Sequence, residues 1–164
     1  MKSKKIALFG LLIALAFVLS YIESLIPVFI AIPGVKLGLT NLVVLIALIN
    51  FGKKEALFIN VIRIILVGLS FGNAYSLLYS LAGGILSFAA MSLLLRKKTF
   101  STLGISVAGG VCHNIGQIVV ASFVLETGAL VYYLPVLMIS GTIAGVLVGI
   151  LCGEIVKRLP PLND

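Results

Sequence analysis

The stretch that decides the fold runs from Thr102 to Leu125 and reads TLGISVAGGVCHNIGQIVVASFVL. It is long enough to cross a bilayer, which takes about 20 mostly apolar residues. Its middle, GGVCHNIGQ at 109–117, contains His113, the only histidine of the chain. A polar side chain at that depth is costly and usually faces a cavity or a partner. The stretch therefore predicts a membrane helix that contributes to a polar site.

The composition of the whole chain points to the same environment. Of its 164 residues, 61% are hydrophobic and only 10% are charged, and the mean hydropathy is +1.27. Soluble domains carry about 25% charged residues. The net charge of +7 does not indicate a nucleic-acid partner, because the basic residues fall between apolar runs instead of clustering on one face. Both cysteines lie inside apolar segments, so no disulfide framework is expected.

Six apolar segments qualify, or nearly qualify, as membrane spans, at approximately 5–26, 37–51, 55–71, 73–95, 102–125 and 129–156. Lipid offers no hydrogen bonds to an open backbone, and no alternation of period two appears, so the spans are expected to be helices. We predict an all-α membrane protein with a single six-helix transmembrane domain over residues 1–164. The first segment also resembles a signal peptide, but the five spans after it favour an uncleaved helix.

The basic residues predict the orientation. Ten of the twelve lie on one side, whereas Lys36 lies on the other and Arg63 lies inside a span; the ten are Lys2, Lys4, Lys5, Lys53, Lys54, Arg96, Lys97, Lys98, Lys157 and Arg158. Short loops rich in lysine and arginine stay in the cytoplasm. Both termini are therefore expected to be cytoplasmic.

Small residues form two stripes at helical spacing. Gly141, Gly145, Gly149 and Gly153 recur every four residues in the last segment. They allow close helix packing, either within the chain or between subunits. Ala7, Gly10 and Ala14 form the second stripe, in the first segment. This stripe either packs inside the bundle or docks a partner protein.

Arg63 and the residues around His113 are the strongest candidates for ligand contact. Arg63 lies near the middle of its span, some 12 Å from either end at about 1.5 Å per residue, so its side chain cannot easily reach water. It is either paired internally or anchors an anionic ligand. His113 and Gln117 are four residues apart on one helix face, and Asn114 is adjacent. A lone buried histidine is usually structural, but these polar neighbours favour a ligand contact.

Further candidates lie toward the predicted outer side. Tyr75 and Tyr79 either belong to an interfacial belt or line a pocket. The run PGVKLGLTN at 33–41 contains Lys36 and Asn41. Lys36 is either solvated or closes over an acidic ligand, and Asn41 offers a polar group just inside the membrane.

Several motifs are missing from the sequence. It has no P-loop, and its only aspartate is Asp164, so paired aspartates that hold Mg²⁺ on a diphosphate are lacking. It has no second histidine for a metal site. We expect no catalytic activity, no metal and no cofactor.

The six spans, the Ala7–Ala14 stripe, the PGVKLGLTN run and the HNIGQ run at 113–117 together resemble the Gx transporter family. That family is also labelled heptaprenyl diphosphate synthase component I, and it is similar to the substrate-binding (S) components of energy-coupling-factor (ECF) transporters. The resemblance implies an S-component bundle in the bacterial cytoplasmic membrane that binds a vitamin-like solute near its outer face. It also implies a transmembrane coupling (T) protein and two cytoplasmic ATPases as partners, with Ala7, Gly10 and Ala14 as the docking surface and the loop at 23–36 as a gate.

The resulting prediction is an S component of an ATP-driven importer that captures a small vitamin-like or anionic solute. Lys36, Asn41, Arg63, Tyr75, Tyr79, His113, Asn114 and Gln117 are its expected binding residues. Two alternatives stay open. One is a noncatalytic membrane subunit linked to heptaprenyl diphosphate or quinone synthesis, and the other is a structural subunit of a membrane complex.

Overall fold

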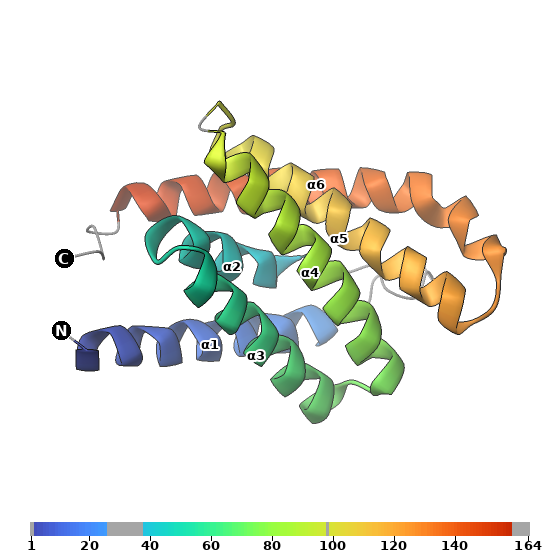
Figure 1. Cartoon of the computed structure of the whole chain (residues 1–164), viewed down its shortest axis with the longest axis horizontal. Coiled ribbons are helices and arrows are strands. Elements are labelled where there is room, and N and C mark those ends of the chain that lie inside the picture. Colours follow the sequence, from blue (N-terminus) through green and yellow to red (C-terminus); the bar gives the residue numbers. More distant parts are fainter. Residues whose placement is uncertain (1, 26–37, 98, 159–164) are drawn as a thin grey trace.

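The chain is a bundle of helices. A computed structural model describes residues 2–25, 38–97 and 99–158. The elements are α1 (Lys2–Leu25), α2 (Leu39–Asn50), α3 (Lys53–Phe71), α4 (Ala74–Arg96), α5 (Thr102–Val124), the short 3₁₀ helix η1 (Gly128–Tyr133) and α6 (Leu134–Arg158) (Figure 1). No strand occurs in these ranges. The predicted all-α class is therefore confirmed.

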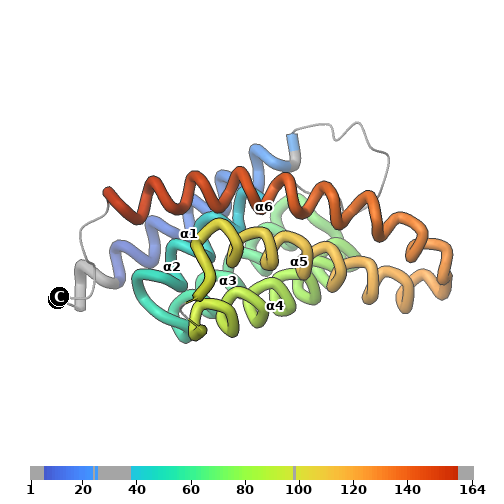
Figure 2. The backbone as a smooth tube through the Cα atoms, turned by 90° about the horizontal axis from the view of Figure 1, so that it is seen from above, coloured from blue at the N-terminus to red at the C-terminus, as the bar shows by residue number. Residues whose placement is uncertain are grey.

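Four helical stretches are long and apolar enough to cross a membrane: Ile6–Glu23 in α1, α4, α5, and η1 together with α6. They identify a membrane protein. Helix α2 is apolar but has only 12 residues. Helix α3 carries Lys53, Lys54, Glu55 and Arg63 among its 19 residues. The start of α1 and the end of α6 lie at the same end of the bundle (Figures 1 and 2). The count of six spans and the membrane side of the termini stay predictions.

The last segment begins differently from the prediction. Residues 128–133 form η1, with the Thr127 hydroxyl accepting a hydrogen bond from the Ala129 amide, and the α-helix begins only at Leu134. Pro135 is the second residue of α6. Proline has no N–H to donate and is favoured in the first turn of a helix. This preference accounts for the later start of the α-helix.

Helix α2 is the centre of the bundle. Every residue from Thr40 to Leu48 is buried, and its aliphatic side chains form the largest share of the hydrophobic core that any described helix supplies. A helix that is apolar on all sides is stable only when neighbours cover all sides. Helices α1, α3 and α6 supply the main contacts around α2. Along its described length, α1 contacts only α2 and α3, so α1 lies at the edge of the bundle.

Helix α5 lies between α4 and α6, and glycines set these close approaches (Figure 2). A methyl group at Gly145 of α6 would lie 2.6 Å from the Val107 Cα of α5, and one at Gly149 would lie 2.8 Å from the Leu103 Cα. Gly141 faces Gly110 in the same way. A methyl group at Gly153 would meet nothing within 4 Å. Three of the four glycines thus pack within this chain.

Candidate functional site

A polar cavity of about 170 Å³ lies among the first five helices. Helix α1 contributes Ser20 and Glu23, whereas α3 contributes Arg63. The remaining polar side chains of the lining are Thr40, Asn41, Ser76, Ser80 and His113. A cavity with this lining inside an apolar bundle is unusual, because polar groups at such depth are costly unless they are bonded or functional. It is the candidate functional site.

Arg63 is held by hydrogen bonds from two helices. Only 6% of the residue is exposed. Its Nη1 donates to the Thr40 hydroxyl at 2.7 Å, and its Nε and Nη2 donate to the Asn60 Oδ1 at 3.2 and 2.9 Å. Asn60 is itself fixed, because its Nδ2 donates to the Gly84 carbonyl of α4 at 3.0 Å. A guanidinium has five N–H groups. Arg63 therefore retains donors for a ligand in the cavity.

Glu23 is the acidic residue of the site, although the expectation from the sequence was only that it begins the loop at 23–36. It lies in the last turn of α1 and is 8% exposed. Its Oε1 accepts hydrogen bonds from the amides of Gly38 and, at 3.4 Å, of Leu39, so it caps the first turn of α2. Gly38 has φ 74°, a left-handed conformation that suits glycine. The carboxylate also stabilises the positive charge of Arg63.

A sequence signal for Glu23 did exist. It is the only acidic residue before Glu55, and it ends an otherwise apolar segment. A buried arginine elsewhere in the chain needs a counter-charge. An internal pair was one of the two expectations for Arg63, but its partner residue was not identified.

His113 lines the cavity from α5 and is 8% exposed. The glycines of α4 bring that helix close to it. A methyl group at Gly83 would lie 2.7 Å from the His113 carbonyl oxygen and 3.0 Å from its Nδ1. The next residue, Gly84, faces Asn60 and Ile64 of α3. The glycine pair of α4 therefore allows α3 and α5 to hold Arg63 and His113 at one cavity.

A family model described as heptaprenyl diphosphate synthase component I matches residues 12–155. The chain belongs to this family. No curated protein and no solved structure matches the chain significantly. The resemblance to the heptaprenyl diphosphate synthase component I family is thus confirmed, and the likeness to ECF S components stays a prediction. The described cavity lining, from Ser20 to His113, lies inside the matched region of this family member.

Three further residues that were predicted to bind the solute lie away from the cavity. The Asn114 Nδ2 donates to the Leu137 carbonyl at 2.7 Å, which joins α5 to α6. Gln117 and Tyr79 line a second, apolar cavity of only about 30 Å³. The structure therefore brings together Asn41, Arg63 and His113 and separates them from these three residues.

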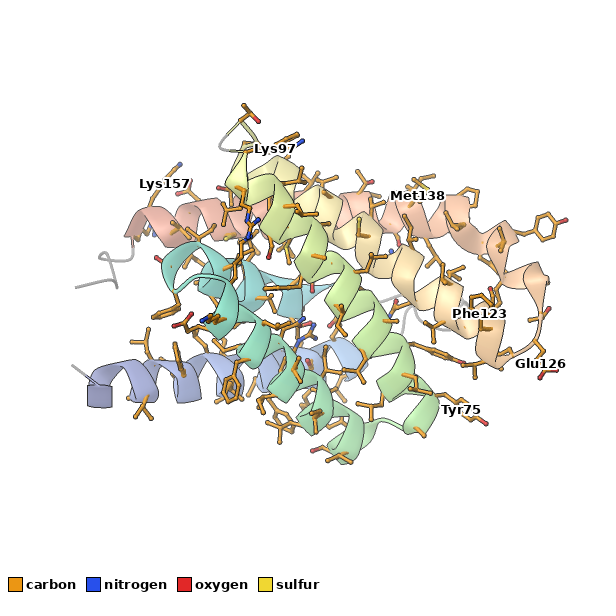
Figure 3. The ribbon with its side chains drawn as sticks, viewed as in Figure 1. Tyr75, Lys97, Phe123, Glu126, Met138 and Lys157 are labelled. Carbon is orange, nitrogen blue, oxygen red and sulfur yellow. The ribbon has the colours of Figure 1, made fainter. Side chains whose placement is uncertain are left out.

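Two other predicted binding residues are not part of the described cavity. Tyr75 is 58% exposed, and its side chain points away from the bundle at the end of α4 that lies opposite Lys157 (Figure 3). Lys36 falls outside the described residues, as does most of the predicted gate at 23–36.

The three residues that were predicted to dock a partner protein lie on an exposed face of α1. Ala7, Gly10 and Ala14 are all exposed, and a methyl group at Gly10 would meet nothing within 4 Å. They do not pack inside the described bundle. In the same described ranges, no three histidine, cysteine, aspartate or glutamate residues gather closely enough to hold a metal ion.

Proposed function

We propose that this protein is the membrane-embedded substrate-binding component of an ECF-type importer and that the cavity around Arg63 captures its solute. The observation that carries the proposal is a buried arginine at the wall of a cavity in a membrane protein. A charge at this depth costs about 2.5–3.5 kcal/mol even on insertion scales. Five helices supply groups around this charge and still leave space beside it. Such an arrangement is typical of a binding site.

The geometry favours a small solute. Pockets for drug-sized ligands measure about 300–1,000 Å³, and this cavity measures about 170 Å³. The donors that Arg63 retains suit a carboxylate or phosphate oxygen, since the planar guanidinium binds such groups in a defined geometry. The proposed ligand is therefore a small, vitamin-like molecule that has at least one acidic group.

The open stripe on α1 supports a partner that lies in the membrane. Small residues allow the backbones of two membrane helices to approach closely, and Ala7, Gly10 and Ala14 are exposed together. The sequence has no P-loop, so the proposed energy source is a pair of cytoplasmic ATPases joined to this chain through a T protein. In this proposal the chain is not an enzyme. It lies in the bacterial cytoplasmic membrane with both termini inside.

The family description favours one alternative, a noncatalytic membrane subunit linked to heptaprenyl diphosphate synthesis. Arg63 would then meet the diphosphate group. A chain of seven isoprene units is longer than a cavity of about 170 Å³ can enclose, so the hydrocarbon would have to lie outside the bundle. The volume therefore favours the transport proposal.

Release of a bound molecule tests the proposal. The protein is purified in mild detergent, denatured and analysed by mass spectrometry, alongside Arg63→Ala and the matched control Arg96→Ala, which removes an exposed arginine at the end of α4. Wild type and Arg96→Ala should release the same small compound, and Arg63→Ala should release none. Proteins that copurify are identified in the same preparations. A T protein with ATPases supports transport, whereas a soluble prenyltransferase favours the alternative. If wild type releases nothing and brings no ATPase, the transport proposal fails.

A further inference from the structure

Ser20 lies on the buried face of α1, at the point where that face changes from apolar to polar. Ala16 and Leu12, one and two turns earlier, belong to the hydrophobic core, whereas Ser20 lines the cavity. Residues four apart share one face of a helix. The face that packs α1 against the bundle therefore brings a hydroxyl group to the cavity wall.

The Ser20 hydroxyl has no hydrogen-bond partner within the part of the chain that the structure describes, although the residue is only 7% exposed. Serine and threonine in helices often bond to the carbonyl four residues earlier. In α6 the Thr142 hydroxyl donates in this way to the Met138 carbonyl, at 2.8 Å. Buried polar side-chain atoms are nearly always bonded. The Ser20 hydroxyl is therefore available to a molecule in the cavity.

A molecule in the cavity would connect α1 to helices that α1 does not contact. Along its described length, α1 contacts only α2 and α3. The cavity is also lined by Ser76 and Ser80 of α4 and by His113 of α5. Arg63 of α3 retains donors for the acidic group of a solute, and Ser20 belongs to a different helix. A solute that contacts both would attach the edge helix more firmly to the bundle.

We propose that Ser20 is a solute-binding residue, and that the solute bridges α3 and α1 by placing its acidic group on Arg63 and a second hydrogen-bonding group on the Ser20 hydroxyl. This inference rests on the proposed function and narrows its ligand to acids with a second polar group. A hydroxyl both donates and accepts hydrogen bonds, so an alcohol, amine, amide or carbonyl suits this position. The bound solute supplies the missing partner of Ser20 and holds the last turns of α1.

The test measures binding of the compound released from wild type, re-added as a pure standard to protein dialysed free of it, by calorimetry in mild detergent. Ser20→Ala removes the hydroxyl at the cavity wall. The matched control is Ser92→Ala, because the Ser92 hydroxyl of α4 is also buried without a partner among the described residues but does not line the cavity. Hydrogen exchange of the α1 amides, with and without the compound, reports on the bridge between the helices.

Ser20→Ala should bind the compound about two- to tenfold more weakly than wild type does, as expected for one lost hydrogen bond. Ser92→Ala should bind it as wild type does. Without the compound, neither variant should melt at a lower temperature than wild type, because alanine removes an unbonded buried hydroxyl and favours the helix. The compound should slow amide exchange in the last turns of α1, and at saturation it should slow this exchange less in Ser20→Ala.

Two kinds of result separate the claims. Wild-type affinity in Ser20→Ala, a lower melting temperature of this variant without the compound, or α1 exchange that the compound leaves unchanged would overturn the bridge and leave the proposed function standing. A released compound whose only polar group is one acid would do the same. Release of nothing from wild type would instead overturn the proposed function, and the bridge with it.

Discussion

Asn60 is the residue through which α4 fixes Arg63, and Asn60→Ala tests whether that arrangement stabilises the protein. The side chain is 1% exposed. It accepts two hydrogen bonds from Arg63, at 3.2 and 2.9 Å, and donates one to Gly84 at 3.0 Å. Alanine removes all three. It also leaves a buried guanidinium with Thr40 as its only hydrogen-bond partner among the described residues.

The expected loss can be estimated from the environment. Hydrogen bonds between membrane helices contribute about 0.6 kcal/mol on average and about 1.7 at most. The two bonds to a charged donor belong near the upper value, although they share one acceptor oxygen, and the bond to Gly84 belongs near the average. The free energy of unfolding should therefore fall by about 2–4 kcal/mol. The matched control is Asn50→Ala, whose side chain bonds only to the Ile46 carbonyl of its own helix at 2.9 Å. It should cost less than about 1 kcal/mol, because alanine also favours the helix.

The assay is unfolding by SDS from mild detergent micelles, followed by circular dichroism. A double-mutant cycle with Arg63→Ala separates the pairwise interaction from general damage, and a coupling energy of about 1–2 kcal/mol is expected. The reasoning is refuted if Asn60→Ala loses no more stability than Asn50→Ala, or if its effect adds to that of Arg63→Ala without coupling.

Three further predictions concern glycines and use thermal unfolding unless another assay is named. Gly145→Ala should lower the free energy of unfolding by about 1–3 kcal/mol, because its methyl group would meet the α5 backbone. Gly153→Ala should be neutral or slightly stabilising, since the space there is open, and equal effects of the two variants would contradict the packing of α6 on α5. Gly38→Ala should cost about 1–2 kcal/mol because its φ of 74° strains an L-residue; an unchanged melting temperature would show that the turn adapts. Gly10→Leu should leave stability and ligand release unchanged but abolish copurification of the proposed T protein and ATPases, as judged by mass spectrometry; retained partners would show that docking uses another surface.

The hydrophobic pattern of the sequence was enough to predict most of the helix starts. Segment length and hydropathy predicted the all-α class and five helix starts to within about three residues, since burial in lipid leaves the backbone few alternatives. The exception, at residues 128–133, depends on Pro135, a local effect that hydropathy does not register. The short second segment was predicted as a span. Its place at the centre of the core could not be read from the sequence, because it depends on which helices surround it.

The candidate site was only partly predictable. Arg63 and His113 stood out because each is a polar residue deep in an apolar segment, and the structure does place both at one cavity. Asn114 is one residue from His113, which turns its side chain about 100° around the helix toward α6. Gln117 shares the face of His113 but lies one turn farther along, beyond the cavity. Glu23 was missed because its partners are the amides of Gly38 and Leu39, some 15 residues away, and only the fold brings them together.

Helix α1 joins the two proposed activities of the protein. Its last turns contribute Ser20 and Glu23 to the cavity, and its earlier turns present Ala7, Gly10 and Ala14 on an open face. Along its described length it contacts only α2 and α3, and Glu23 bonds it to the first turn of α2. A solute in the cavity would therefore lie against the helix proposed to contact the T protein. By linkage, any change in solute affinity caused by docking must be matched by an equal change in docking affinity caused by the solute. Because the two sets of residues lie on one continuous helix, α1 is the shortest covalent path for such coupling.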